Sequence, residues 1–150
     1  MIHSNEKIIS FFEVDATSIV ADSYFYFTNE VIEGQNFITF DGIDYMSYPV
    51  KIEGFEKNIE GRFPEPTITF ANINGYITGL IQIFNGFRGC PVIRRRIYYD
   101  DVDNPSLEFI PDKYFISRYN ETSLTVTLYL QSLLDRGNFQ IPARRVIQLL

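Results

Sequence analysis

The stretch Cys90-Pro-Val-Ile-Arg-Arg-Arg-Ile-Tyr-Tyr-Asp-Asp101 places three consecutive arginines inside a run of β-branched and aromatic residues. Such residues favour a strand, in which successive side chains point to opposite faces. Arg94 and Arg96 therefore share one face, and Arg95 lies on the other. Because apolar side chains accompany arginine on both faces, we expect residues 91–100 to form a strand within a sheet. The arginines are expected to pair with carboxylates, from the acidic connection that follows or from a neighbouring subunit.

The composition of the chain indicates one mainly β domain. Its 150 residues are 45% hydrophobic and 16% aromatic, which is enough to bury a single core without a disulfide or a metal. Abundant Tyr, Phe, Ile and Thr favour strands over helices. We predict a single β-barrel or β-sandwich domain over residues 12–150, preceded by an N-terminal arm or short helix at residues 1–11.

Hydrophobic periodicity places the elements of this domain. Strands are expected at residues 12–17, 24–28, 36–40, 45–52, 67–71, 91–100, 114–120 and 123–131, in the order of a meander. The Asp41-Gly42 step predicts a hairpin turn. One amphipathic helix is predicted over residues 76–87, because its apolar residues recur at helical spacing, namely Ile77, Leu80, Ile81 and Phe84. Residues 100–111 are expected to form a solvated acidic connection.

The charge distribution argues against a nucleic-acid-reading module. Residues 1–60 carry 3 basic and 11 acidic side chains, a net charge of −8, whereas residues 61–150 carry 10 and 8, a net charge of +2. The pI is near 4.7, and the arginine run is divided between two faces of its strand. Neither feature provides the basic surface that phosphate backbones require.

Candidate catalytic and metal-ligating residues are sparse. Asp100, Asp101 and Asp103 lack the regular spacing and the glycine of a calcium loop. Cys90 is the only cysteine and His3 the only histidine, which excludes an intrachain disulfide and disfavours a Cys–His nucleophile pair. We therefore expect no enzyme, cofactor or metal.

A small β-barrel enzyme or ligand-binding protein is the alternative class. It would require a polar cleft in which Asp100, Asp103 and Glu108 converge. The sequence also has no apolar run near the roughly 20 residues that span a bilayer, and its N-terminus lacks the pattern of a signal peptide. We expect synthesis in the cytoplasm and no membrane association.

Several stretches taken in order carry a family resemblance. They are Tyr24-Phe-Tyr-Phe-Thr-Asn-Glu30, Phe40-Asp-Gly-Ile-Asp-Tyr-Met-Ser-Tyr-Pro-Val50, Glu53-Gly-Phe-Glu56, Pro66-Thr-Ile-Thr-Phe-Ala-Asn72, Gly75-Tyr-Ile-Thr-Gly-Leu80, Val92-Ile-Arg-Arg-Arg-Ile-Tyr98, Arg118-Tyr-Asn-Glu-Thr-Ser123 and Ile141-Pro-Ala-Arg-Arg145. This series resembles the N-terminal region of the phage lambda-type minor tail protein L family. Longer members continue into a cysteine-rich domain associated with an iron–sulfur cluster. With Cys90 as the only cysteine, the cluster is not carried over to this sequence.

The resemblance implies a structural virion protein of the tail tip of a long, non-contractile-tailed phage. It implies a β module related to tail-tube and hub proteins, assembled as a homo-oligomeric ring. The implied partners are the distal tail protein, the host-recognition protein of the tip and the tape-measure protein. DNA would pass through the lumen without specific binding. A tail-assembly factor that is absent from the finished virion is the alternative within this class.

A ring requires self-complementary or head-to-tail contacts, for which aromatic and arginine residues are the enriched types. The candidate interface residues are Tyr24, Tyr26, Arg94, Arg96, Arg144 and Arg145. The segment 141–150 has neither a turn nor a polar cap, and we expect it to dock on its own sheet or on a partner. The acidic N-terminal half is expected to line the lumen, where it would repel DNA.

Overall fold

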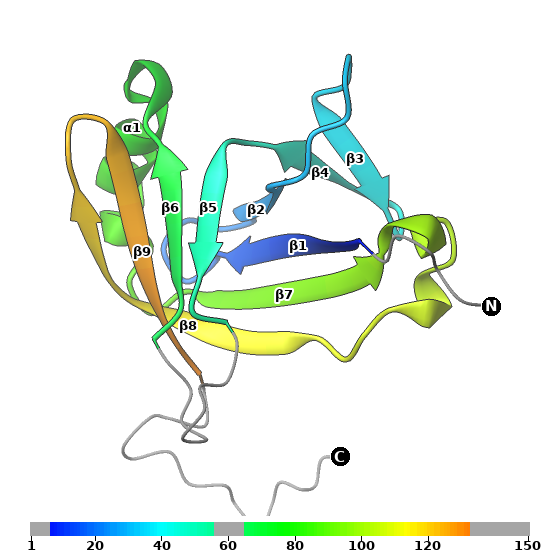
Figure 1. Ribbon diagram of the computed structural model, residues 1–150. Coiled ribbons are helices and arrows are strands. Elements are labelled where there is room, and N and C mark those ends of the chain that lie inside the picture. Colours follow the sequence, from blue (N-terminus) through cyan, green and yellow to red (C-terminus); the bar gives the residue numbers. More distant parts are fainter. Residues whose placement is uncertain (1–6, 56–64, 133–150) are drawn as a thin grey trace, which may run out of the picture.

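The computed structural model describes residues 7–55 and 65–132, which form one mixed sheet of nine strands and one short α-helix (Figure 1). The strands are β1 (Ile8–Asp15), β2 (Tyr24–Thr28), β3 (Phe37–Phe40), β4 (Ile43–Ser47), β5 (Val50–Glu53), β6 (Thr67–Ala71), β7 (Pro91–Tyr98), β8 (Asp112–Glu121) and β9 (Thr125–Ser132). The helix is α1 (Tyr76–Ile83), and short 3₁₀ turns are η1 (Ile73–Gly75), η2 (Asn85–Phe87), η3 (Tyr99–Asp101) and η4 (Pro105–Leu107). The predicted mainly β fold with a single amphipathic helix is confirmed.

The sheet curls around its core but does not close into the predicted barrel, because its two edge strands do not pair with each other. Its order is β3-β4-β2-β1-β7-β8-β9-β6-β5, with β3 and β5 at the edges. Figure 1 shows β5, β6 and β9 standing across from β2 and β4, with β1, β7 and β8 running beneath them. The Tyr48 amide donates to the Thr28 carbonyl, and the Ala71 amide donates to the Pro49 carbonyl. The link between β4 and β5 therefore crosses from one half of the curled sheet to the other.

Strand boundaries and strand order depart from the sequence-based prediction most clearly in three places. Strand β1 begins at Ile8, so residues 8–11 belong to the sheet and not to an arm or helix. The predicted strand over residues 45–52 is divided at Tyr48 and Pro49 into β4 and β5. The meander is also interrupted, because β7 lies between β1 and β8 while β4 pairs with β2 in parallel.

Two separate cores cover opposite faces of β1. Phe12 belongs to the larger core, in which Ile77 and Ile81 of α1 pack against the sheet. Phe11 belongs to the smaller core, where its ring stacks on Phe40 with a centroid distance of 4.7 Å. Consecutive residues of a strand point to opposite faces, so adjacent phenylalanines can both be fully buried. The smaller core lies where the β3–β4 hairpin folds against β1 and β7.

The helix ends earlier than its apolar pattern predicts. Helix α1 ends at Ile83, and Asn85 and Gly86, which follow Phe84, have positive φ angles of 51° and 70°. A Cβ atom on Gly86 would lie 2.4 Å from the ring of Tyr119 on β8. The glycine therefore allows both the left-handed backbone that ends the helix and the close approach of the chain to the sheet.

Candidate functional site: the arginine strand and the aromatic groove

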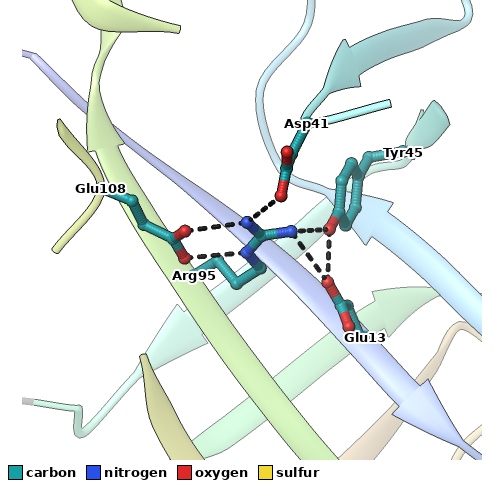
Figure 2. Close-up of polar contacts among 5 residues, drawn as sticks. All are labelled: Glu13, Asp41, Tyr45, Arg95 and Glu108. Atoms are coloured by element: carbon teal, nitrogen blue, oxygen red, sulfur yellow. Dashed lines mark hydrogen bonds and ion pairs between the residues drawn. The ribbon is translucent and has the colours of Figure 1, made fainter. Parts of the chain in front are cut away.

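Arg95 is the centre of a polar network on one face of β7 (Figure 2). Its Nε and Nη2 atoms donate to the two carboxylate oxygens of Glu108, each at 2.8 Å. Nη2 also donates to Asp41 at 2.8 Å, and Nη1 donates to the Tyr45 hydroxyl at 3.3 Å and to Glu13 at 3.4 Å. The Tyr45 hydroxyl in turn donates to Glu13 at 2.5 Å. We call these five residues the Arg95 network.

Four segments of the chain supply the partners of Arg95. Glu13 lies on β1, Tyr45 on β4, Asp41 in the β3–β4 turn, and Glu108 in the connection after β7. The Arg95 guanidinium lies over the ring of Phe40 in the smaller core, and its central carbon is 4.7 Å from the centroid of that ring. Only 12% of the Arg95 side chain is exposed. A single side chain thus joins the hairpin, the N-terminal strand and the acidic connection.

Two members of the network, Arg95 and Tyr45, have raised pKa values. The hydrogen bonds from Arg95 to Glu108 raise the pKa of Arg95 well above its usual value, against the opposing effect of burial. Burial raises the pKa of Tyr45, and the hydrogen bond to Glu13 raises it further. Neither Arg95 nor Tyr45 exchanges a proton near neutral pH, so both side chains are suited to holding the fold together.

The other two arginines share a carboxylate on the opposite face of β7. Arg94 donates from Nη2 and Nε to Asp112 of β8, at 2.7 Å and 3.1 Å, and only 8% of the residue is exposed. Arg96 approaches the same carboxylate at 3.4 Å and keeps 27% of its side chain exposed. Their guanidiniums lie over the rings of Phe55 and Phe109. The predicted division of the arginines between two faces, and their pairing with carboxylates, are confirmed within one chain.

The acidic connection is only partly solvated. Glu108 is 15% exposed at its side chain because it pairs with Arg95, which corrects the expectation for that residue. Asp103 is exposed. Within residues 7–55 and 65–132, no three His, Cys, Asp or Glu side chains lie close enough to hold a metal ion. Cys90 is buried as a free thiol, and burial raises its pKa.

A cavity of about 220 Å³ opens between α1 and the strands β2, β3 and β4. We call it the aromatic groove. Its lining is Val14, Tyr24, Phe25, Tyr26, Phe27, Phe37, Asp44, Met46, Tyr48, Phe70, Tyr76, Ile77, Leu80, Ile81, Phe87 and Leu128. Tyr24 is 51% exposed, and its ring stacks on that of Tyr26. The lining does not include Asp100, Asp103 or Glu108, the residues whose convergence would indicate a polar catalytic cleft.

Comparison with known proteins identifies the family. Residues 17–150 match the family model described as phage minor tail protein L. The chain belongs to the phage minor tail protein L family. A curated relative is tail tip protein L of Escherichia phage lambda, which is 32% identical over 114 residues. The alignment covers 71% of this chain and 48% of that protein, so this chain spans about half the length of the relative.

The candidate interface residues of this minor tail protein lie in different surroundings. Tyr24 and Tyr26 line the aromatic groove, whereas Arg94 is buried in an ion pair and Arg96 is partly exposed. Arg144, Arg145 and the predicted docking segment 141–150 lie outside the described residues. No helix in the described part of the chain is both long enough and apolar enough to span a bilayer.

Sequence patterns missed most of the Arg95 network and nearly all of the groove. The run of four aromatic residues at 24–27 was the one local signal for the groove. In a strand these residues place aromatic side chains on both faces, and each face must pack against other residues. The other lining residues come from elements far apart in the chain. The acidic residues after β7 signalled one partner of the arginine run, but not which arginine it binds.

Proposed function

We propose that this phage minor tail protein is a structural component of the tail tip, where copies of it form a hub ring. The carrying observation is the family match over residues 17–150, together with the identity to a relative that is named a tail tip protein. The ring would lie between the distal tail protein and the host-recognition protein, and it would contact the tape-measure protein. Its role is structural and not enzymatic.

Two features of the described residues support an assembly role. Arg96 has a partly exposed guanidinium whose buried Nε atom has no hydrogen-bond partner among the described residues. The Arg96 guanidinium lies over the ring of Phe109, and the next residue, Ile110, is 86% exposed. An arginine beside a partly buried aromatic ring and an exposed apolar side chain is a composition enriched at protein interfaces. We place Arg96 at a subunit contact, while Arg94 serves the fold of the single chain.

The charge of the chain suits a ring with a lumen that passes DNA. The charged residues of the described N-terminal half are mainly acidic, and much of the basic charge of β7 is neutralised by carboxylates of the same chain. A surface of this kind repels phosphate backbones instead of binding them. DNA would therefore pass without specific contacts.

Quantitative mass spectrometry of purified tails tests the proposal. We expect the chain in a fixed ratio to the other tip proteins, at several copies per tail. A chain that is required for tail formation but absent from finished tails would instead be an assembly factor, and the ring proposal would be rejected. The variant Arg96→Glu should fold as a monomer but reduce incorporation into tails, whereas Lys51→Glu, at an exposed position on β5, should be incorporated normally.

A further inference from the structure

The aromatic groove lies along a free edge of β2. Strands β2 and β4 pair only at Phe27–Met46 and Thr28–Ser47, so the described residues include no strand that pairs with this edge of β2 at Tyr24 or Phe25. The groove is lined by Tyr24 and Tyr26 from one face of the strand and by Phe25 and Phe27 from the other. Because alternate side chains point to opposite faces, a cavity touched by both sets lies at the strand edge.

The backbone of β2 has groups directed toward this edge. The Thr28 carbonyl accepts from the Tyr48 amide, on the side of β2 away from β1. Backbone groups of alternate residues in a strand point the same way, so those of Tyr26 and Tyr24 also point away from β1. The parallel pairing of Phe27 with Met46 occupies the Tyr26 carbonyl, which leaves the Tyr26 amide and both backbone groups of Tyr24 at the uncovered edge. An uncovered strand edge beside an apolar groove is the arrangement to which an extended peptide adds as a further strand.

The size and the charge of the groove indicate what it binds. A cavity of about 220 Å³ is smaller than the ~300–1,000 Å³ typical of small-molecule sites, and it suits one or two apolar side chains. Asp44 is the one charged side chain in its lining, and it is exposed. One oxygen of that carboxylate accepts from the Thr39 hydroxyl at 2.6 Å. A cation is the complement of this rim.

We propose that the aromatic groove binds an extended segment of a partner tail protein. The segment pairs with the free edge of β2 at Tyr24–Tyr26, inserts one bulky apolar side chain between β2 and α1, and places a Lys or Arg beside Asp44. In an extended segment, residues two apart share a face, so the apolar and basic residues are separated by one residue. The site stands on the groove alone and goes beyond the hub proposal, which can fail without affecting it.

The test is an NMR titration of the full-length protein with a synthetic seven-residue peptide. The peptide carries threonine at alternate positions, and a phenylalanine and a lysine stand two residues apart at its centre. Two control peptides replace the lysine by glutamate or the phenylalanine by alanine. The protein variant Asp44→Asn removes the rim charge, and Asp103→Asn, at an exposed position outside the groove, is its matched control. Leu80→Trp fills the groove from α1.

We expect the phenylalanine–lysine peptide to shift the amide signals of Tyr24–Tyr26 and the methyl signal of Met46. The lysine peptide should bind about two- to five-fold more tightly than the glutamate peptide, which is the effect of one exposed ion pair. This ratio should vanish in Asp44→Asn and persist in Asp103→Asn, and Leu80→Trp should abolish binding. The proposal is overturned if the peptide does not bind, binds elsewhere, or binds Leu80→Trp equally well. Groove signals that shift with protein concentration alone would overturn it too, since the occupant would then be a second copy.

Discussion

Arg95 and Glu108 face each other through two parallel hydrogen bonds of 2.8 Å, and this pair attaches the connection after β7 to the face of the sheet that carries the smaller core. Bidentate arginine–carboxylate pairs are among the strongest polar contacts in proteins, because two hydrogen bonds and opposite charges act together. Asp41 and Tyr45 attach the β3–β4 hairpin to the same guanidinium. Arg95 therefore holds both the β3–β4 hairpin and the connection after β7 against the sheet.

Replacing Arg95 by methionine should lower the free energy of unfolding by about 2–4 kcal/mol, because Glu13 and Glu108 would be left partly buried without a cation. The measurement is urea denaturation at neutral pH. The control Lys51→Met removes a cation from an exposed pair on β5 and should change stability by less than about 1 kcal/mol. Equal effects of the two substitutions would show that the Arg95 network does not stabilise the fold.

Arg94 and Arg118 provide a second matched comparison, of a buried and an exposed arginine. Arg94→Ala should cost about 2–4 kcal/mol, since Asp112 would lose its main partner and the ring of Phe55 its covering guanidinium. Arg118 is more than half exposed and pairs with Glu65, so Arg118→Ala should cost about 1 kcal/mol or less. Thermal unfolding of both variants checks this. If Arg94→Ala were as stable as the wild type while failing to enter tails, Arg94 would be an interface residue after all.

Tyr45 should make stability depend on alkaline pH. Its pKa is raised by burial in the folded state, whereas in the unfolded chain it is near the usual value of about 10. A raised pKa means that the contribution of Tyr45 is fully present below about pH 10 and is lost as pH rises through the folded value. Tyr45→Phe should cost about 1–2 kcal/mol at pH 7, where the hydrogen bond to Glu13 is removed.

Urea unfolding of wild type and Tyr45→Phe at pH 7, 9 and 11 measures this dependence. The gap between the two proteins should be constant from pH 7 to pH 9 and smaller at pH 11. The remaining tyrosines ionise in both proteins, so their effects largely cancel in the difference. A gap that stays the same at all three values would contradict the assignment to Tyr45.

Gly86 and Gly79 differ in what a methyl group would meet. Gly86→Ala should destabilise the protein by about 2–4 kcal/mol, because its φ of +70° disfavours an L side chain and the new Cβ would overlap the Tyr119 ring. Gly79 lies within α1, and a methyl group added there would meet no neighbouring side chain within 4 Å, so Gly79→Ala should stabilise by roughly 0.5–1 kcal/mol. Differential scanning calorimetry on both variants decides the point, and a neutral Gly86→Ala would refute the close approach.

Local patterns predicted the elements whose neighbours lie nearby in the sequence. The alternation in residues 24–28, 67–71 and 91–100 identified strands, and the apolar face of residues 76–87 identified the helix, although the last of these strands ends at Tyr98 and the helix at Ile83. These features follow from the two periods of backbone structure, which any short segment reveals. The same alternation also divided the arginines correctly between the faces of β7.

Features that depend on distant residues could not be predicted in this way. Arg95 lies 82 residues from Glu13, and nothing in either segment specifies the other. The break at Tyr48–Pro49 arises because β4 and β5 pair with different halves of the sheet, which the strand-like pattern of residues 45–52 does not show. The position of β7 between β1 and β8 is likewise a property of the whole core. The groove appears only when these elements are brought together.

Electron cryo-microscopy of intact tails, with this chain identified by its side-chain density, is the most direct test of the central claim. We predict a ring of several copies at the tail tip, with Arg96 at a subunit boundary and the acidic N-terminal half toward the lumen. Density that places the chain elsewhere in the tail, or a tip ring built entirely from other proteins, would contradict the account.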